Sequence, residues 1–436
     1  MPETRQLTSM QTFIIIWLGQ LCSTMGSYMT AFALTLWAWE LTGQATTLAL
    51  VGFFTQMPQF AISLIAGVIV DRSDRKILIM LGDAIAGLSS LVLLWLYLNG
   101  HLQIWHLYAT AAVNGACGQI QELAYSASIT LMVPKQQYTR ASGMMSALHY
   151  GSAIVAPALA GVLFYMIGLA GILSIDLITF AIAISTVLFI TIPQPVAPIR
   201  DIAVPSIKQE LIFGCRYLWK QSNLLALLLA ALLFQFAHDL GAALYSPMIL
   251  ARSGNDARVL GSIASAAGIG GVVGAVIVST WGGTKRRIDG FLLGMVGAGI
   301  SKSIFGIGQT ALIWVPAQFC SSLNFPWMSS SSEAIWMSKI KPDIQGRVFA
   351  TRSAFILGTS AIATLIAGPL ADRVFEPAMT SGGWMANILG GIFGTGTGAG
   401  IAVLYVLSSL SLLLIGLISY SFRNLREIEA IVPDSL

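Results

Sequence analysis

The acidic side chains that interrupt long apolar runs are the residues of this chain best suited to chemistry. Glu122 lies near the middle of one such run, and Asp239 lies in another, directly after His238. A carboxylate at the centre of a membrane helix costs about 2.5–3.5 kcal/mol on the insertion scale, so each needs a reason to be there. A carboxyl group shielded from water can bind a proton and release it later in a cycle. We therefore predict that Glu122, Asp239 and His238 couple proton movement to the activity. Structural ion pairs, or neutralisation by Lys302, are the alternatives.

Polar side chains also recur at helical spacing in two of the runs. The run at residues 12–37 carries Gln20, Ser23, Thr24 and Ser27. The run at residues 223–250 carries Gln235, His238 and Asp239. Positions i, i+3, i+4 and i+7 share one face of a helix. We predict that these faces, together with His149, line a cavity for a small molecule. Close packing of small polar residues is the alternative.

The elements that must position these side chains are membrane helices. Of the 436 residues, 56% are hydrophobic and only 10% are charged, against about 45–50% and 25% in soluble domains. A chain so poor in charge cannot cover a water-facing surface, which excludes a soluble protein. A run of about 20 apolar residues spans the hydrocarbon as a helix. Twelve such runs are found, at residues 12–37, 46–70, 77–98, 103–132, 141–165, 169–191, 223–250, 259–281, 290–309, 311–338, 348–371 and 398–421.

Basic residues mark one side of the membrane. All but four of the 23 Lys and Arg residues fall on the side of the N-terminus when the runs are threaded back and forth. Lys and Arg are enriched in cytoplasmic loops, so we predict a multi-pass protein of the plasma membrane with both termini in the cytoplasm. The net charge of +4 is explained by this bias, so nucleic acid is not expected as a partner. A lipid bilayer and a monomeric state are expected.

The chain divides into two halves that resemble each other. Pro134 and Gln137 recur as Pro342 and Gln345 at a constant offset, and other short matches follow in the same order. Parallel repeats of this kind place a site between two bundles near the middle of the membrane. We predict a six-helix bundle at residues 1–191, a cytoplasmic linker with an amphipathic surface helix at 192–222, and a second six-helix bundle at 223–436.

Half of the residues in the segment GVIVDRSDRK, residues 67–76, are charged. Gly67, Asp71, Arg72, Arg75 and Lys76 resemble the signature loop of the major facilitator superfamily. Gly67 is expected to let two helices approach closely. A carboxylate at position 71 can sit against the N-terminus of a helix, a contact worth about 0.3–1 kcal/mol.

We predict that this segment forms a releasable latch on the cytoplasmic side. Asp71 would meet the start of the eleventh helix near Arg347, and Asp83 would pair with the basic residues of the latch. A charge cluster that only fixes the topology is the alternative. Asp74 stands where the family pattern usually has Gly.

Further residues extend the resemblance over nearly the whole chain. They are WLGQ at residues 17–20, LTG at 41–43, Asp83, and IKPDIQGRVF at 340–349. Together they resemble the macrolide-efflux branch of the superfamily, which is close to the siderophore-exporter branch. The resemblance implies an all-α fold of twelve transmembrane helices, arranged as two pseudo-symmetric six-helix bundles with alternating access.

We predict a secondary active transporter that exports a small amphipathic molecule, drug-like or macrolide-like, by proton antiport. The proton gradient replaces a cofactor, and none is expected. The alternatives are an exporter of an endogenous metabolite such as a siderophore, a lysolipid transporter, and a membrane receptor or scaffold that does not transport. No Ser-His or metal-ligand constellation stands out in the sequence, so neither an enzyme nor a metal site is expected.

Overall fold

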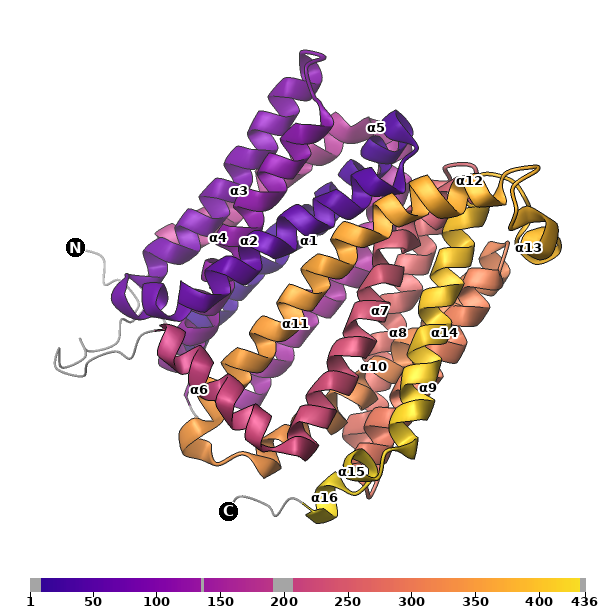
Figure 1. Ribbon diagram of the computed structural model, residues 1–436. Helices are drawn as coiled ribbons and strands as arrows, with labels where there is room; N and C mark the ends of the chain where they lie inside the picture. Colours follow the sequence, from indigo (N-terminus) through magenta and orange to yellow (C-terminus); the bar gives the residue numbers. More distant parts are fainter. Residues whose placement is uncertain (1–8, 135–136, 191–206, 432–436) are drawn as a thin grey trace. The chain divides into compact units, whose positions relative to one another are not determined.

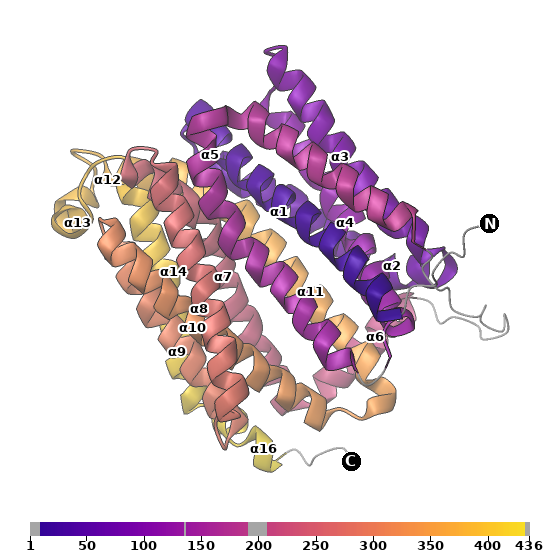
Figure 2. The same ribbon diagram turned by 180° about the vertical axis from the view of Figure 1, so that it is seen from behind.

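The computed structural model describes residues 9–134, 137–190 and 207–431, and this part of the chain is helical with no strand (Figures 1 and 2). The first helices are α1 (Ser9–Thr42), α2 (Ala45–Arg72), α3 (Arg75–Leu98), α4 (Ile104–Met132) and α5 (Tyr138–Leu188). They are followed by α6 (Ile207–Lys220), α7 (Ser222–Ser253), α8 (Ala257–Trp281), α9 (Arg287–Ile307), α10 (Ala311–Lys339) and α11 (Pro342–Leu370). A π-helical turn, η2 (Ala371–Phe375), then leads through α12 (Glu376–Met379) and α13 (Ala386–Phe393) to α14 (Ala399–Ser421), α15 (Arg423–Arg426) and α16 (Ile428–Ile431).

The predicted apolar runs coincide with these helices. Two runs, 141–165 and 169–191, fall on α5, and Gly168 divides that helix with φ of 63° and ψ of −172°. Only glycine adopts such a backbone without strain, so the break lies where the sequence places a glycine. Residue 191 lies outside the described part of the chain.

Within the described residues, eight helical segments are long and apolar enough to cross a membrane. Helices α1, α4 and α10 are not among them, and α10 carries four consecutive serines at 329–332 in addition to two prolines. The all-α membrane fold is therefore confirmed, while the count of twelve spanning helices stays a prediction.

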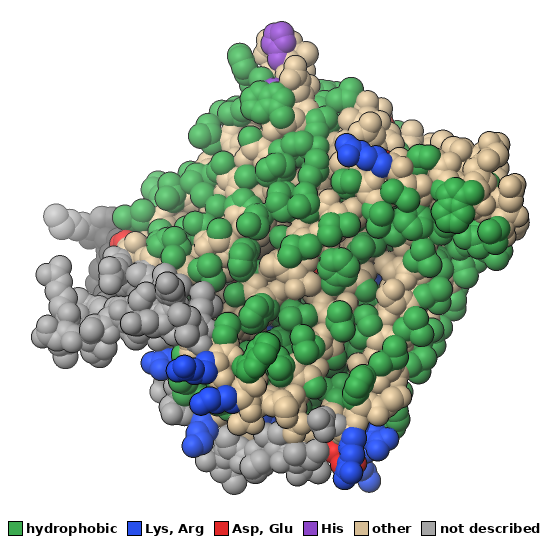
Figure 3. Space-filling view, viewed as in Figure 1, with side chains coloured by type: hydrophobic (Ala, Val, Ile, Leu, Met, Phe, Trp, Pro, Cys, Tyr) green, Lys and Arg blue, Asp and Glu red, His purple; other side chains and the backbone are tan. Residues whose placement is uncertain are grey.

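Large apolar side chains cover the surface of the helices. Trp95, Leu312 and Ile388 are 61%, 87% and 74% exposed. Figure 3 shows hydrophobic side chains over most of the visible face, with Lys and Arg gathered mainly at its lower end. Soluble proteins rarely expose apolar area on this scale, so this surface is made for contact with lipid.

The contacts divide the chain into two compact units. Unit 1 comprises Met1–Trp37 and Phe54–Val204, and unit 2 comprises Ala38–Phe53 and Pro205–Leu436. Residues 38–53, which we call the elbow, contain the end of α1 and the first turns of α2. They contact unit 2 although they lie within the predicted first bundle. The predicted division at 1–191, 192–222 and 223–436 stays a prediction.

Each unit has its own apolar core. Phe13, Ile16 and Ile79 are fully buried in the core of unit 1. Ile335, Trp336 and other fully buried residues from α7, α9 and α10 form a core in unit 2. These cores fix the helices that carry the polar side chains described below.

Helix α8 packs closely on α10 because it presents glycine at that interface. Gly270 and Gly274, four residues apart, face the backbone of α10, and a Cβ at position 274 would lie 2.6 Å from the Leu323 carbonyl oxygen. Small residues at this spacing let membrane helices approach closely.

We expect Gly274→Ala to destabilise the protein by about 1–3 kcal/mol, because the added methyl group overlaps backbone that cannot move aside. The matched control is Gly271→Ala, whose Cβ would meet nothing within 4 Å. Thermal unfolding of both variants in detergent is the measurement. Equal melting temperatures would contradict the proposed packing of α8 on α10.

Candidate functional site

Asp239 is the centre of a polar cluster inside unit 2. The Gln235 amide, one turn earlier on α7, donates a hydrogen bond to Asp239 Oδ2 at 2.8 Å. The Ser360 hydroxyl, which comes from α11, donates to the same oxygen. Both donors are neutral, so this carboxylate is held in place without a direct ion pair to either of them.

Lys302 brings a buried positive charge to the same cluster. Its side chain is on α9 and is 5% exposed. The ammonium lies 5.9 Å from the ring centroid of Phe325 and 5.8 Å from that of Tyr405, and its charge acts on Asp239. A buried ammonium requires compensation, which the two rings and the carboxylate supply. The cluster thus contains one acid and one base.

His238 lies in an aromatic environment. Its ring centroid is 4.8 Å from that of Phe325, and it stacks on Phe234 at 6.3 Å. Its Nδ1 atom is buried and has no hydrogen-bond partner in the part of the chain that the structure describes. Neighbours in sequence point in different directions on a helix, but the Phe325 ring lies beside both His238 and Lys302. The role of His238 in proton coupling stays a prediction.

A second buried acid occupies the interior of unit 1. Asp83 is 2% exposed, and its two oxygens accept hydrogen bonds from Gln20 at 2.8 Å and from Gln121 at 2.7 Å. Gln20, predicted to line a cavity, is itself only 8% exposed and holds this carboxylate. Asp83 thus bonds amides, where the sequence led us to expect the basic residues of the latch.

The remaining predicted cavity and coupling residues are spread over unit 1. Ser23 is buried on α1, and Thr24 and Ser27 are partly buried there. Glu122 and His149 are exposed. The structure therefore does not gather these side chains around one described cavity, and their roles stay predictions.

Two other acids lie within the apolar runs at 169–191 and 311–338, and each has a partner. Asp176 is 1% exposed and accepts a hydrogen bond from the Ser90 hydroxyl at 2.7 Å. Glu333 on α10 forms a 2.7 Å ion pair with Arg352 on α11. The first contact joins α3 to α5 in unit 1, and the second joins α10 to α11 in unit 2.

The predicted latch is described only in part. The side chains of Asp71 and Arg72 lie outside the described residues. Arg75 donates to the Ala127 carbonyl at 2.7 Å, and Lys76 donates to the Ile190 carbonyl at 2.7 Å. These bonds attach the start of α3 to neighbouring helices of unit 1.

Three other residues near the latch have clear surroundings. A Cβ at Gly67 would meet no described atom within 4 Å, and the close helix approach expected there stays a prediction. Asp74 caps α3 by accepting from the Lys76 and Ile77 nitrogens, at 2.8 and 3.2 Å, which explains an acid where the family pattern has glycine. Arg347 lies 5.3 Å from the Phe213 ring of α6.

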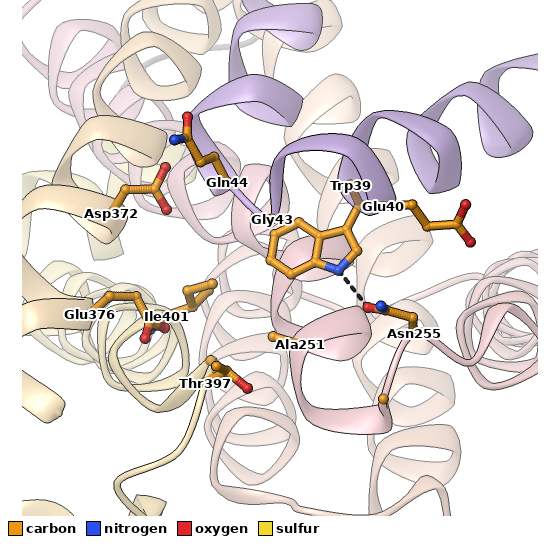
Figure 4. Close-up of a pocket in the computed structure, with 12 residues that line it drawn as sticks. Trp39, Glu40, Gly43, Gln44, Ala251, Asn255, Asp372, Glu376, Thr397 and Ile401 are labelled. Carbon is orange, nitrogen blue, oxygen red and sulfur yellow. Dashed lines mark hydrogen bonds between the residues drawn. The ribbon is translucent and has the colours of Figure 1, made fainter. Parts of the chain in front are cut away.

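A pocket of about 620 Å³ lies in unit 2 beside the elbow (Figure 4). Three acidic residues line it, Glu40, Asp372 and Glu376, and the Glu40 carboxylate points away from the other two (Figure 4). Trp39 closes one side, and its indole donates to Asn255 Oδ1 at 2.8 Å. Sequence reasoning missed this site because its acids lie at the ends of apolar runs, where charge is ordinary.

Long helices with apolar surfaces, apolar cores and acids buried among them define a multi-pass membrane protein. The sequence profile of the Major Facilitator Superfamily matches residues 16–357, and the chain belongs to this family. It is a transport protein rather than an enzyme. Its membership of this transporter family and its efflux relatives imply a small-molecule substrate.

Curated relatives and solved structures agree with this assignment. Macrolide efflux protein A of Streptococcus pyogenes is 27% identical over 365 residues, covering 83% of this chain and 90% of that protein. The protein of the same name from Enterococcus faecalis is 29% identical over 307 residues, covering 70% of this chain and 94% of that protein. The crystal structure of the nucleoside transporter NupG superimposes with a TM-score of 0.67 at 12% identity, covering 94% of this chain and 100% of that one.

Proposed function

We propose that this chain exports a small amphipathic molecule across the bacterial plasma membrane by alternating access, and that proton entry drives the export. The macrolide-efflux relatives support export and a macrolide-like substrate. The positions of the basic residues support cytoplasmic termini. We propose a monomer as the working unit.

The observation that carries the proton coupling is the cluster of Asp239 and Lys302 inside unit 2. Asp239 accepts hydrogen bonds only from an amide and a hydroxyl among its described partners. Because both donors are neutral, no ion pair to them has to break when the carboxyl group gains or loses a proton. Its charge, however, is felt by Lys302, so each protonation changes the electrostatic balance in the interior. Such a change can favour one conformation over another.

Proteoliposomes that contain the purified protein and a trapped pH dye test the proposal. We expect addition of a macrolide antibiotic to produce proton movement that empty liposomes lack and that a protonophore abolishes. Macrolide transport without a pH change would contradict proton coupling. Proton movement with a siderophore or a lysolipid, and none with a macrolide, would assign the substrate to one of those classes. No movement of any of these solutes would favour a receptor or scaffold.

A further inference from the structure

The first turn of α2 is capped by a residue from the far end of the chain. Asp372 in η2 accepts the Ala45 N–H at 3.0 Å through Oδ1 and the Thr46 N–H at 2.7 Å through Oδ2. The first N–H groups of a helix have no partner within it, and Gln44, which precedes α2, is not a residue type that usually caps helices. The elbow therefore obtains its cap from the end of α11.

Two further contacts hold the elbow on unit 2. Gly368 lies one turn before Asp372, and a Cβ there would be 2.9 Å from the Thr46 nitrogen. Trp39, which is 7% exposed, donates to Asn255 from the other side of the elbow (Figure 4). Two separate segments of unit 2 thus contact the elbow: the end of α11 with η2, and the residues between α7 and α8.

The cap is also built to be released. Asp372 lines the 620 Å³ pocket, so water can take the place of the two N–H groups once they leave. Because water can replace the lost partners, the net free energy of such hydrogen bonds is modest, although bonds to a charged group are stronger than neutral ones, and the cap can open. The carboxylate sits in the π-helical turn Ala371–Phe375, and such turns are frequent at functional sites.

We propose that Asp372 is a positioning residue that clasps the elbow on unit 2, and that release of this clasp is a step of the transport cycle. The inference rests on the alternating access of the proposed function, because one helix pair must change partners when access alternates. Removing the carboxylate shifts the population toward the released elbow. In this role Asp372 need not contact the substrate or bind a proton.

Labelling of a buried cysteine in the elbow tests the clasp. Ala45 is fully buried, so Ala45→Cys should react slowly with a polar maleimide while the elbow is docked. The four natural cysteines, at positions 22, 117, 215 and 320, are first replaced by serine. We expect Asp372→Ala to raise the labelling rate of purified protein at least tenfold. The matched control is Glu40→Gln, which removes an acid from the same pocket and leaves the rate unchanged.

A second variant keeps the test decisive if Asp372→Ala unfolds. Gly368→Ala places a methyl group against Thr46 while leaving the carboxylate intact, and we expect it to raise labelling as well. An unchanged rate in both variants, or an equal rise in Glu40→Gln, would overturn the clasp. The assay needs neither substrate nor gradient, so a positive result beside absent proton coupling would refute the proposed antiport and leave the clasp standing.

Discussion

Replacing Asp239 by asparagine is expected to abolish proton-driven transport and to leave the protein folded. Asparagine has the same shape, and its carbonyl oxygen can still accept from Gln235 and Ser360, so the packing of α7 on α11 is kept. It cannot bind or release a proton. We expect proton-coupled transport in proteoliposomes to fall by about two orders of magnitude, the scale on which removal of a proton-transfer group acts.

Substrate exchange at equal pH separates coupling from binding. If Asp239 carries the proton, Asp239→Asn should still exchange labelled substrate across the membrane without a gradient. Glu122→Gln is the matched comparison, since Glu122 is the other predicted coupling acid and is exposed. Full proton coupling in Asp239→Asn together with its loss in Glu122→Gln would transfer the role to Glu122.

The helices, and the face that carries Asp239, could be predicted from the sequence. Apolar runs of sufficient length leave a helix as the only way to satisfy the backbone in lipid. Gln235 and Asp239 are four residues apart, and that spacing alone puts them on one face of α7, where a hydrogen bond joins them. The sequence shows Lys302 as the single charged residue in the run at 290–309. It does not show how far Lys302 lies from Asp239.

Contacts between helices could not be predicted in this way. The bonds from Gln20 and Gln121 to Asp83 join three helices, and no spacing within one helix reports which helices meet. The cap on α2 is harder still, because Asp372 lies 327 residues from Ala45 and bonds backbone groups that every residue possesses. The sequence does contain one indication. Gln44, which precedes α2, is not a usual capping residue, so an acceptor for the first N–H groups of α2 had to come from elsewhere.

The cap also changes how the predicted latch is understood. The sequence led us to expect a carboxylate from the end of α2, Asp71, at the start of α11. The structure shows the reverse arrangement, with Asp372 from the end of α11 at the start of α2. A helix N-terminus attracts a carboxylate wherever it occurs. A chain with two related halves can therefore use the same kind of contact at the start of α2 and at the start of α11. The contact of Asp71 stays a prediction.

Lys302→Met decides between a proton carrier and a structural ion pair. If Asp239 and Lys302 form a fixed buried pair, removing the lysine leaves an unpaired charge and should cost about 3–5 kcal/mol of stability. If Asp239 exchanges protons, it can become neutral instead. Methionine then fills the space between Phe325 and Tyr405, and the melting temperature in detergent should change little.

In that second case Lys302→Met should lose proton-coupled transport as completely as Asp239→Asn, because an acid with no nearby positive charge keeps its proton throughout the cycle. The double variant Asp239→Asn with Lys302→Met supplies the control. For a fixed ion pair it should restore the stability that each single variant loses. For a proton carrier all three variants should melt alike and transport nothing against a gradient. Retention of coupling in Lys302→Met would show that this lysine does not set the charge state of Asp239.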